Sequence, residues 1–477
     1  MDLCRPLRLV LVGRGKRSRT TGDHLVLVLV SVALVLAAAG CKRHVQNGDD
    51  IDTDAGYQGD ACVGLSCFLV DCAAKGLPPT SVSGTVYAPN GTLPLYGVTV
   101  YVPIGDPGPL PSGAQCDRCA NGPLGGAYTQ TQTDEAGHFT LKDVPATSDV
   151  PLVIQVGKWR RQLKVPNVAA CQDVPLAATE TRLPAKKSEG DLPKIALAVG
   201  NADALECLAR KMGIADSEFS ITSGSGAVNL FNGNGATTFA ANWPGGPGPF
   251  PATTTLWNDV NTLKNYDITF LSCEGAQNPA TKLQPALDAM KAYADLGGRV
   301  FASHWHNIWL EGSTQGGGTQ APAVWSGAAG VATWNNSGTT FATPDTIDET
   351  SNPKGASFAT WMLNVGASPA SMRDVVPMNS GKQTATGIIG GKAERWVYWN
   401  SGGVEYPQIF QFTTPLEQPT NSRCGKVVFS DMHVSGNSSS TAAVPFPGGC
   451  SVAALTPQEK ALAFIFFDIA SCVGVIN

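Results

Sequence analysis

The chain has 477 residues, enough for two to four domains, and its hydrophobic content of 43% is that of a protein with a buried core. Charged residues make up only 15%, whereas 53 glycines and 33 prolines favour loop-rich β structure over helical bundles. The formal net charge of −5 argues against nucleic acid as a partner.

Residues 1–40 have the pattern of an export signal, because basic residues precede the uncharged run LVLVLVSVALVLAAAG, which ends at Cys41. The end of this run, LAAAGC, resembles the lipobox of bacterial lipoproteins, which implies that Cys41 becomes a lipidated N-terminus. Together with Lys42, the resemblance implies an outer-membrane lipoprotein of the bacterial cell envelope. A transmembrane anchor is the alternative, but the run is shorter than the ~20 residues that a spanning helix needs.

Residues 41–80 are predicted to be a flexible tether that contains cysteines, since the residues after Cys41 are polar and show no apolar period. An exported chain with this many cysteines is expected to hold disulfides, and the odd number beyond Cys41 leaves a thiol over. We predict that Cys273 is this free thiol. Cys116 and Cys119, in CDRC, are predicted to form a structural bridge, because the strand and helix of a thioredoxin site are missing.

Residues 81–180 are predicted to form a small β-sandwich. Apolar residues alternate in SVSGTVYAP and GVTVYVP, and further short strands are expected in AYTQTQT, HFTLKDVP and PLVIQVGKW. The succession of SGTVYAPNG, PLYGVTVYV and TDEAGHFTLKDVP resembles the carboxypeptidase regulatory-like domains, which are transthyretin-like sandwiches. This resemblance implies a module without catalytic activity.

Residues 181–193 are predicted to be a linker, and residues 194–477 an α/β domain with a mainly parallel sheet flanked by helices. The apolar runs KIALAV, YDITFL, RVFAS and GKVVFS predict strands buried on both faces. Helical periodicity in ADALECLARKMG, TKLQPALDAMKAYADLGG and TPQEKALAFIFFDIASC alternates with them. Long loops rich in Gly and Trp are predicted between residues 311 and 405.

The carboxyl ends of parallel strands are where open sheets bind ligands. The candidate catalytic residues are the polar side chains expected at these ends: Cys273, Glu274, His304, His306, Asp431 and His433. The stretches YDITFLSCEG and YADLGGRVFASHWH resemble the class I glutamine amidotransferase-like fold, and within it the trehalose-utilisation (ThuA-like) branch. In amidotransferases the nucleophilic cysteine follows the RVFAS-type strand. Because His304 holds that place here, the amidotransferase mechanism does not carry over.

Three interpretations of this group remain open: a structural or sugar-stacking cluster, a metal site and a thiol nucleophile. No cofactor is expected, and zinc is the alternative, with ligands drawn from His304, His306, Asp431 and His433. These ligands lie at scattered strand ends, so we expect no stoichiometric metal. His304 and His433 are expected to face one another, with Trp305 or Trp309 as a ligand platform on the wall of a cleft.

The leading prediction of function is a lipid-anchored cell-envelope protein with a binding or surface-interaction role. Its expected partners are the membrane, through the N-terminal lipid, and a glycan or other envelope proteins. The alternative is an envelope hydrolase that acts on a glycan or an amide through the His, Cys and Asp side chains at the strand ends. A hydrolase needs a base within hydrogen-bond reach of a nucleophile or a metal-bound water. About one bound zinc per chain would therefore favour the hydrolase.

Overall fold

The computed structural model describes residues 62–379, 381–435, 437 and 441–474. The predicted signal of residues 1–40 and the predicted lipid site at Cys41 lie outside the described residues. The rest of the chain, Cys62–Asn477, forms one compact unit. None of the helices described is both long enough and apolar enough to cross a bilayer.

The segment predicted as a sandwich builds two sheets, with strand orders β4-β1-β7 and β3-β2-β5-β6. The strands are β1 (Ser81–Thr85), β2 (Thr99–Pro103), β3 (Ala127–Gln132), β4 (His138–Lys142), β5 (Ser148–Val156), β6 (Trp159–Asn167) and β7 (Asp173–Pro175). Alternate residues such as Val82, Val100 and Ile154 are fully buried in one apolar cluster that the two sheets share. The alternation of apolar and polar residues in the sequence therefore correctly predicts β1 to β5, whereas β6 and β7 were not predicted.

The remaining chain builds a sheet of ten strands in the order β15-β14-β17-β18-β19-β12-β11-β8-β10-β9. The strands are β8 (Ile195–Val199), β9 (Phe219–Ser220), β10 (Val228–Asn232), β11 (Ile268–Leu271), β12 (Arg299–Ser303), β14 (Asp345–Ile347), β15 (Val375–Val376), β17 (Glu394–Ser401), β18 (Val404–Thr414) and β19 (Gly425–Ser430). From β9 to β19 the neighbours in the sheet are parallel, and from β19 to β15 they are antiparallel. The sheet is therefore mixed, with an antiparallel part that the sequence analysis did not predict.

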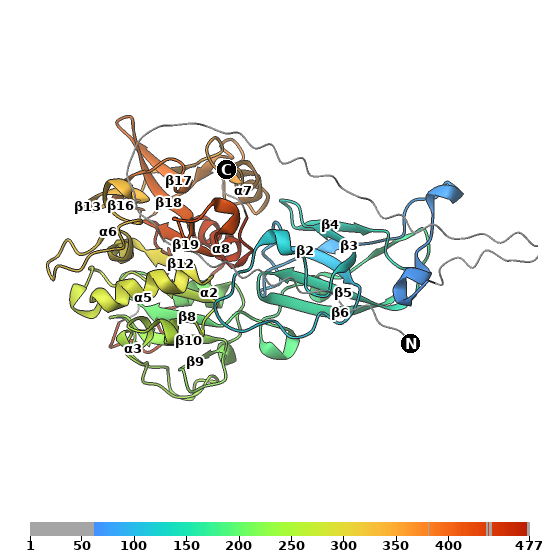
Figure 1. The fold of residues 1–477 in the computed structure, drawn as a ribbon, viewed down its shortest axis with the longest axis horizontal. Coiled ribbons are helices and arrows are strands. Elements are labelled where there is room, and N and C mark those ends of the chain that lie inside the picture. Colours follow the sequence, from blue (N-terminus) through green and yellow to red (C-terminus); the bar gives the residue numbers. More distant parts are fainter. Residues whose placement is uncertain (1–61, 380, 436, 438–440, 475–477) are drawn as a thin grey trace, which may run out of the picture. The chain divides into compact units, whose positions relative to one another are not determined.

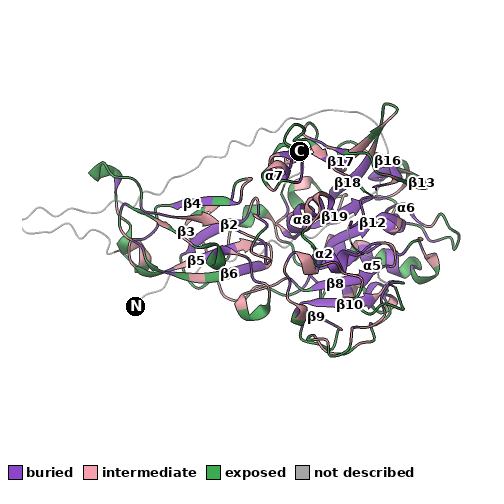
Figure 2. Cartoon of the chain, turned by 180° about the vertical axis from the view of Figure 1, so that it is seen from behind, coloured by how far each residue is buried: buried purple, intermediate pink, exposed green. Residues whose placement is uncertain are grey.

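Helices lie on both faces of this sheet (Figure 1). They are α2 (Leu205–Lys211), α3 (Thr254–Trp257), α4 (Val260–Leu263), α5 (Gln284–Asp295), α6 (Ile308–Glu311), α7 (Gly355–Asn364) and α8 (Pro457–Ala470), and the short α1 (Ala178–Thr181) precedes the sheet. The side chains of β8 alternate between the two faces of the sheet. Leu197 packs in the apolar cluster that includes α2, α7 and α8, whereas Ala196 and Ala198 pack in the apolar cluster that includes α3 to α6. Burial on both faces (Figure 2) explains why these strands have continuous apolar sequences.

The region between residues 311 and 405 is not a set of loops, so this prediction is wrong. Besides β14, β15, β17 and α7, it holds β13 (Ala332–Phe341) and β16 (Gly381–Ile388), which form a separate antiparallel pair. The sequence RWVYWN lies in β17, where Trp396 and Val397 are fully buried. Aromatic and β-branched residues favour strands, and their signal outweighs the Gly and Asn content that suggested loops.

Five disulfides between described residues confirm the prediction that the chain is disulfide-bonded. The pairs are Cys62–Cys67, Cys72–Cys171, Cys116–Cys424, Cys119–Cys472 and Cys207–Cys450. The first two involve the end of the predicted tether, residues 62–80, which also holds two short 3-10 helices.

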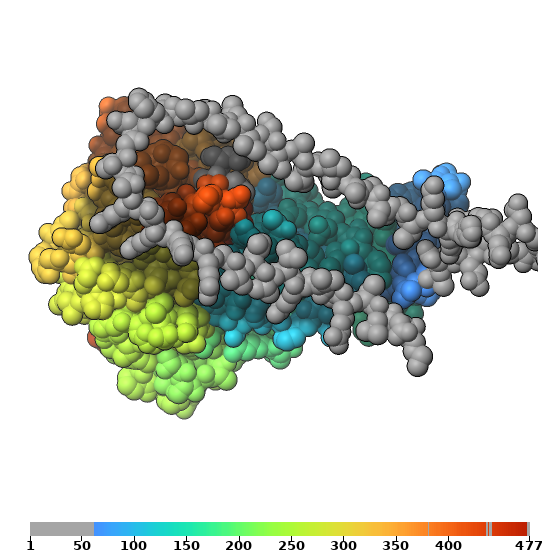
Figure 3. Space-filling model, in the orientation of Figure 1, coloured from blue at the N-terminus to red at the C-terminus, as the bar shows by residue number. Residues whose placement is uncertain are grey.

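The two cysteines of CDRC do not pair with each other, which corrects the predicted bridge. Cys116 and Cys119 instead join the loop before β3 to segments next to β19 and α8. The same two parts of the unit share apolar contacts, since the Trp159 ring packs against Phe466 and Phe467. In Figure 3 teal residues of the sandwich adjoin orange residues of the C-terminal segment. The bridges therefore fix the sandwich against the ten-stranded sheet.

Candidate functional site

The carboxyl ends of β8, β11, β12 and β19 lie along one edge of the sheet, since these neighbouring strands are parallel. Asp203, which follows β8, connects three of these ends. Its Oδ2 accepts a hydrogen bond from Ser303 Oγ at 2.6 Å, and its Oδ1 accepts one from the Val434 backbone N–H at 2.8 Å. Asp203 therefore holds the chain segments that carry His304 and His433 at fixed positions.

His304 has an unusual backbone conformation. It directly follows β12 and has a φ of +45°, in the left-handed region that residues other than glycine seldom adopt. Such a conformation costs on the order of 1–3 kcal/mol and persists only where the surrounding structure enforces it. In this conformation the chain leaves the strand as the 3-10 turn His304–Asn307, and the His304 imidazole lies against Cys273.

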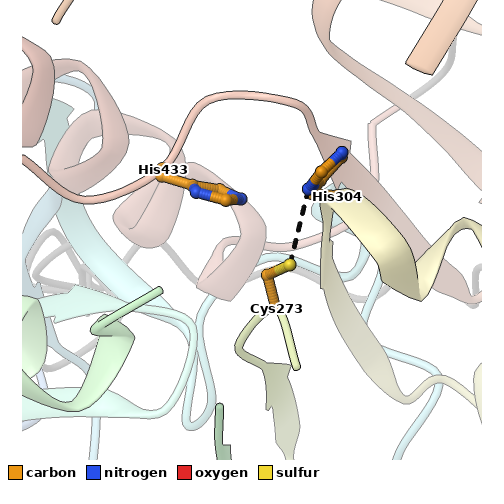
Figure 4. A group of neighbouring side chains, drawn as sticks. All are labelled: Cys273, His304 and His433. Atoms are coloured by element: carbon orange, nitrogen blue, oxygen red, sulfur yellow. Dashed lines mark hydrogen bonds between the residues drawn. The ribbon is translucent and has the colours of Figure 1, made fainter. Parts of the chain in front are cut away.

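Cys273, His304 and His433 come together at this edge (Figure 4). The distance between Cys273 Sγ and His304 Nδ1 is 3.4 Å, and the His304 and His433 ring centroids are 5.1 Å apart. Two predictions are thereby confirmed: the two histidines face one another, and Cys273 is a free thiol. The three residues are only 0%, 3% and 5% exposed, respectively, so this group is enclosed.

Burial controls the protonation of this group. It raises the pKa of the Cys273 thiol to about 12, although backbone N–H groups of Trp305 and Gly275 act in the opposite direction. Burial, aided by the charge of His433, lowers the pKa of His304 to about 2. At neutral pH the thiol and the imidazole are therefore both neutral and share a hydrogen bond between Cys273 Sγ and His304 Nδ1. Burial therefore disfavours the activated thiolate that nucleophilic catalysis requires.

His306 lies apart from this group, because the turn that begins at His304 directs it to the other side. Its Nε2 donates to the backbone oxygen of Ser272 at 3.0 Å, and its Nδ1 accepts from Trp309 Nε1 at 3.0 Å. Burial lowers its pKa well below the usual value. Both ring nitrogens are occupied, so His306 is a neutral structural residue and not a base or a metal ligand.

Trp309 is also a structural residue. Only 1% of it is exposed, and its ring lies against Trp257 and His306 in the apolar cluster of α3 to α6. Its predicted role as a ligand platform is therefore wrong. Trp305 is partly exposed and lies beside His304, with ring centroids 4.8 Å apart.

Glu274 is held by an ion pair. Its Oε2 accepts from Lys282 Nζ at 2.7 Å and from Asn278 Nδ2 at 2.8 Å. The side chains of Lys282 and Glu274 are 0% and 4% exposed. The carboxylate is therefore neutralised and is not available as a general base. The sequence contained no signal for Lys282, which lies just before α5 without a recognisable motif.

Asp431 is oriented by backbone groups and not by the histidines. Its Oδ2 accepts from the N–H groups of Thr384 at 2.8 Å and Ala385 at 2.9 Å, while burial raises its pKa to about 7. It does not belong to the cluster of Cys273, His304 and His433. The predicted site is thus divided: three residues gather, while Glu274, His306 and Asp431 have separate partners.

Asp345, at the start of β14, is a buried acid that the sequence analysis missed because it lies in the region read as loops. Neither carboxylate oxygen has a hydrogen-bond partner among the described residues, and burial together with the charge of Asp431 raises its pKa well above the usual value. A carboxyl whose pKa is raised in the folded state stabilises the fold below about pH 4. That contribution is lost as the pH rises through the folded pKa.

Replacing Asp345 with Asn is therefore expected to reduce the decline of stability with rising pH, because the amide is never charged. We expect D345N to gain stability over the natural chain as the pH rises above about 4, with a slope of at most about 1.4 kcal/mol per pH unit. Urea unfolding at a series of pH values measures this. Asp374, which is exposed, supplies the control D374N, whose pH dependence should match the natural chain. If the free energy of unfolding of D345N changed with pH in the same way as that of the natural chain, the raised pKa of Asp345 would be contradicted.

Comparisons with known proteins identify no family. No family model matches the chain. No curated protein matches it either. Among solved structures, two type II cohesin–X-dockerin complexes from Acetivibrio cellulolyticus, an N-terminal and a C-terminal interface mutant, are 17% and 18% identical to the chain. The matches cover 31% and 30% of this chain and 88% and 76% of those chains, with TM-scores of 0.17 and 0.15. Likenesses this low carry no argument about fold or function.

Proposed function

We propose that the chain is a lipid-anchored protein of the bacterial cell envelope, sorted to the outer membrane, that binds a glycan or another envelope component. Five disulfides support an exported protein, because disulfides persist in oxidising compartments. We further propose that residues 81–180 are a carboxypeptidase regulatory-like sandwich and residues 194–477 an α/β domain similar to the class I glutamine amidotransferase-like fold. The two sheets of the first segment and the parallel strands of the second support these assignments.

A cavity of about 780 Å³ is the observation that carries the binding role. It lies where the loop Asn90–Pro94 of the sandwich meets α2, the end of α7 and the segment before α8. Cavities of this volume bind small molecules or a few residues of a polymer. Because the two parts of the unit are joined by disulfides, the cavity is built between elements with fixed positions.

The cavity is lined by charged and polar side chains as well as apolar ones. Arg210 is bound by Asp216 through two hydrogen bonds of 2.6 and 2.9 Å, and Lys211 is paired with Glu459 at 2.8 Å. Lys460 donates to the backbone oxygen of Val365 at 2.6 Å and has no carboxylate partner among the described residues. Lys460 is therefore the cation left to bind a ligand. A glycan that carries acidic groups fits this arrangement.

The burial and protonation of Cys273 argue against the rival function, a hydrolase with a thiol nucleophile. The 0% exposure of Cys273 leaves no room for a glycan or peptide beside the sulfur, and the raised thiol pKa removes the nucleophile.

The binding role predicts retention of the full chain by peptidoglycan sacculi. We expect the C41S form to sediment with purified sacculi in a saturable manner. K460E should bind about tenfold more weakly, because a charge-assisted hydrogen bond contributes about 1.5–3 kcal/mol. K392E is the matched control, since Lys392 also donates to a backbone oxygen but does not line the cavity. Equal retention of K460E and the parent would contradict binding in the cavity, and no retention of the parent would contradict a glycan ligand.

The same C41S form tests the anchor before it is used for sedimentation. The natural chain should enter the detergent phase in a detergent phase partition, while C41S should remain in the aqueous phase. Cys4, which lies in the predicted export signal, supplies the control C4S, which should still enter the detergent phase. Partition of C41S with the detergent would exclude a lipid at Cys41.

A further inference from the structure

The enclosed group of Cys273, His304 and His433 has a property that the proposed binding role does not use. Each residue offers one potential metal-ligand atom, and these three atoms all lie within 4.8 Å of one another. Figure 4 shows the His433 ring directed toward the space between Cys273 and His304. The three side chains come from three chain segments, after β11, β12 and β19, which are neighbours in the sheet. Their convergence is therefore a product of the parallel sheet.

The distances are close to those of a tetrahedral metal site. With Zn–S near 2.3 Å and Zn–N near 2.0–2.1 Å, ligand atoms around zinc are about 3.3–3.6 Å apart. The separation of 3.4 Å between Cys273 Sγ and His304 Nδ1 already has this value. The remaining separations, at most 4.8 Å, would have to shrink by no more than about 1.5 Å, a small movement of the His433 ring.

The hydrogen bonds around the group leave the ligand atoms available. His433 Nε2 is buried and has no hydrogen-bond partner among the described residues, although buried polar atoms are nearly always paired. Cys273 Sγ accepts a hydrogen bond from the Gly275 backbone N–H at 3.5 Å, which favours a sulfur that carries negative charge. The His433 backbone oxygen accepts from Gln458 Nε2, which holds the residue in place.

We propose that Cys273, His304 and His433 form a zinc site in which Cys273 Sγ, His304 Nδ1 and His433 Nε2 are the ligands. One sulfur and two imidazole nitrogens form a set that zinc prefers, and zinc accepts three protein ligands with a water in the fourth position. Binding displaces the thiol proton to solvent, so the thiolate bonds to the metal and no redox step is involved. Copper also accepts one sulfur and two imidazoles, so the test below measures copper beside zinc.

This site goes beyond the proposed binding role and is independent of it. The three ligands are at most 5% exposed, so the site is closed to a polymer. The zinc would connect the ends of β11, β12 and β19 and so stabilise the edge of the sheet. The proposal departs from the expectation that the chain binds no stoichiometric metal. A zinc at this enclosed site would not favour the hydrolase, because a glycan or peptide cannot reach it, and the envelope-binding function would be unchanged.

The test measures zinc in the full chain purified without chelators, by elemental analysis. We expect about one zinc per chain, and after removal and return of the metal a rise in the unfolding temperature. Cobalt(II) in place of zinc should give the charge-transfer absorption of a thiolate ligand and the intense visible bands of a tetrahedral site. C273S should abolish the thiolate absorption, and H433N should lower zinc affinity at least tenfold.

His138 supplies the matched control, because its side chain is 63% exposed and lies in the sandwich. H138N should retain one zinc and the full cobalt spectrum. Circular dichroism and thermal unfolding of the metal-free variants establish that C273S and H433N are folded. Folded variants that keep one tightly bound zinc would overturn the proposal, as would a natural chain that binds no zinc at stoichiometric concentrations. Stoichiometric binding of copper with no binding of zinc would overturn the choice of metal.

Discussion

Replacing all four cysteines of Cys116–Cys424 and Cys119–Cys472 with serine is expected to lower the free energy of unfolding by more than about 5 kcal/mol. The reason is the length of chain that each bridge closes, 308 and 353 residues, which greatly restricts the unfolded state. Chemical denaturation of the natural chain and the variant, both under oxidising conditions, measures this loss.

The losses of unfolding free energy on removal of the two bridges are not expected to be additive, and this provides a sharper test. When Cys116–Cys424 is intact, Cys119–Cys472 closes an additional loop of only about 50 residues, because the two bridges start and end close together in the chain. We therefore expect C119S/C472S alone to cost about 3–4 kcal/mol, clearly less than the fourfold variant. The pair C62S/C67S, with a separation of 5 residues, is the control and should cost about 2 kcal/mol or less. Equal losses in the twofold and fourfold variants would contradict this account of the two overlapping loops.

Replacing Lys282 with Met is expected to destabilise the fold by about 3–5 kcal/mol, because it leaves the Glu274 carboxylate buried without its counter-ion. Methionine keeps the apolar contact of the lysine stem with the Trp257 ring, over which the ammonium lies at 5.0 Å from the centroid. The loss therefore reports the unpaired charge and not a cavity. Denaturant unfolding at neutral pH measures it.

The double variant K282M/E274Q is the decisive comparison, because it removes the buried charge and keeps an oxygen that accepts from Asn278. It should recover at least about half of the loss. Arg373–Glu349, whose side chains are 42% and 23% exposed, provides the control R373M, which should cost less than about 1 kcal/mol. If K282M were as mild as R373M, Glu274 would be solvated and would again be a candidate for catalysis.

The sequence could predict much of the parallel half of the sheet. Runs such as KIALAV and RVFAS are apolar throughout because β8 and β12 are buried on both faces. The capping box at Thr456 and Glu459 marked the start of α8, since it depends only on residues within one helical turn. The carboxyl ends of neighbouring parallel strands lie at the same edge of a sheet. A parallel arrangement of these strands therefore predicts that Cys273, His304 and His433 lie at one edge.

The antiparallel half of the ten-stranded sheet and the orientation of the His306 side chain could not be predicted from such local patterns. Those strands between residues 311 and 405 that belong to the sheet join it through the pairing of β17 with β18, and Gly-rich strands carry a weak local signal. His306 would share a face with His304 only if β12 continued. The positive φ of His304 ends the strand, and His306 instead contacts Ser272 and Trp309 in the core.

The sequence by itself indicated that Cys273 is free among the described cysteines and that His304 and His433 follow two buried strands, because both follow from counting and from local burial. Only the tertiary structure decided how the other cysteines pair and which ligand atoms meet. A disulfide needs Cα atoms about 4.4–6.8 Å apart, and Cys119 and Cys472 reach 4.9 Å only through folding of the 353 residues between them. The same holds for Cys273, His304 and His433: their distances come from neighbouring strands far apart in the chain, and no local pattern encodes them.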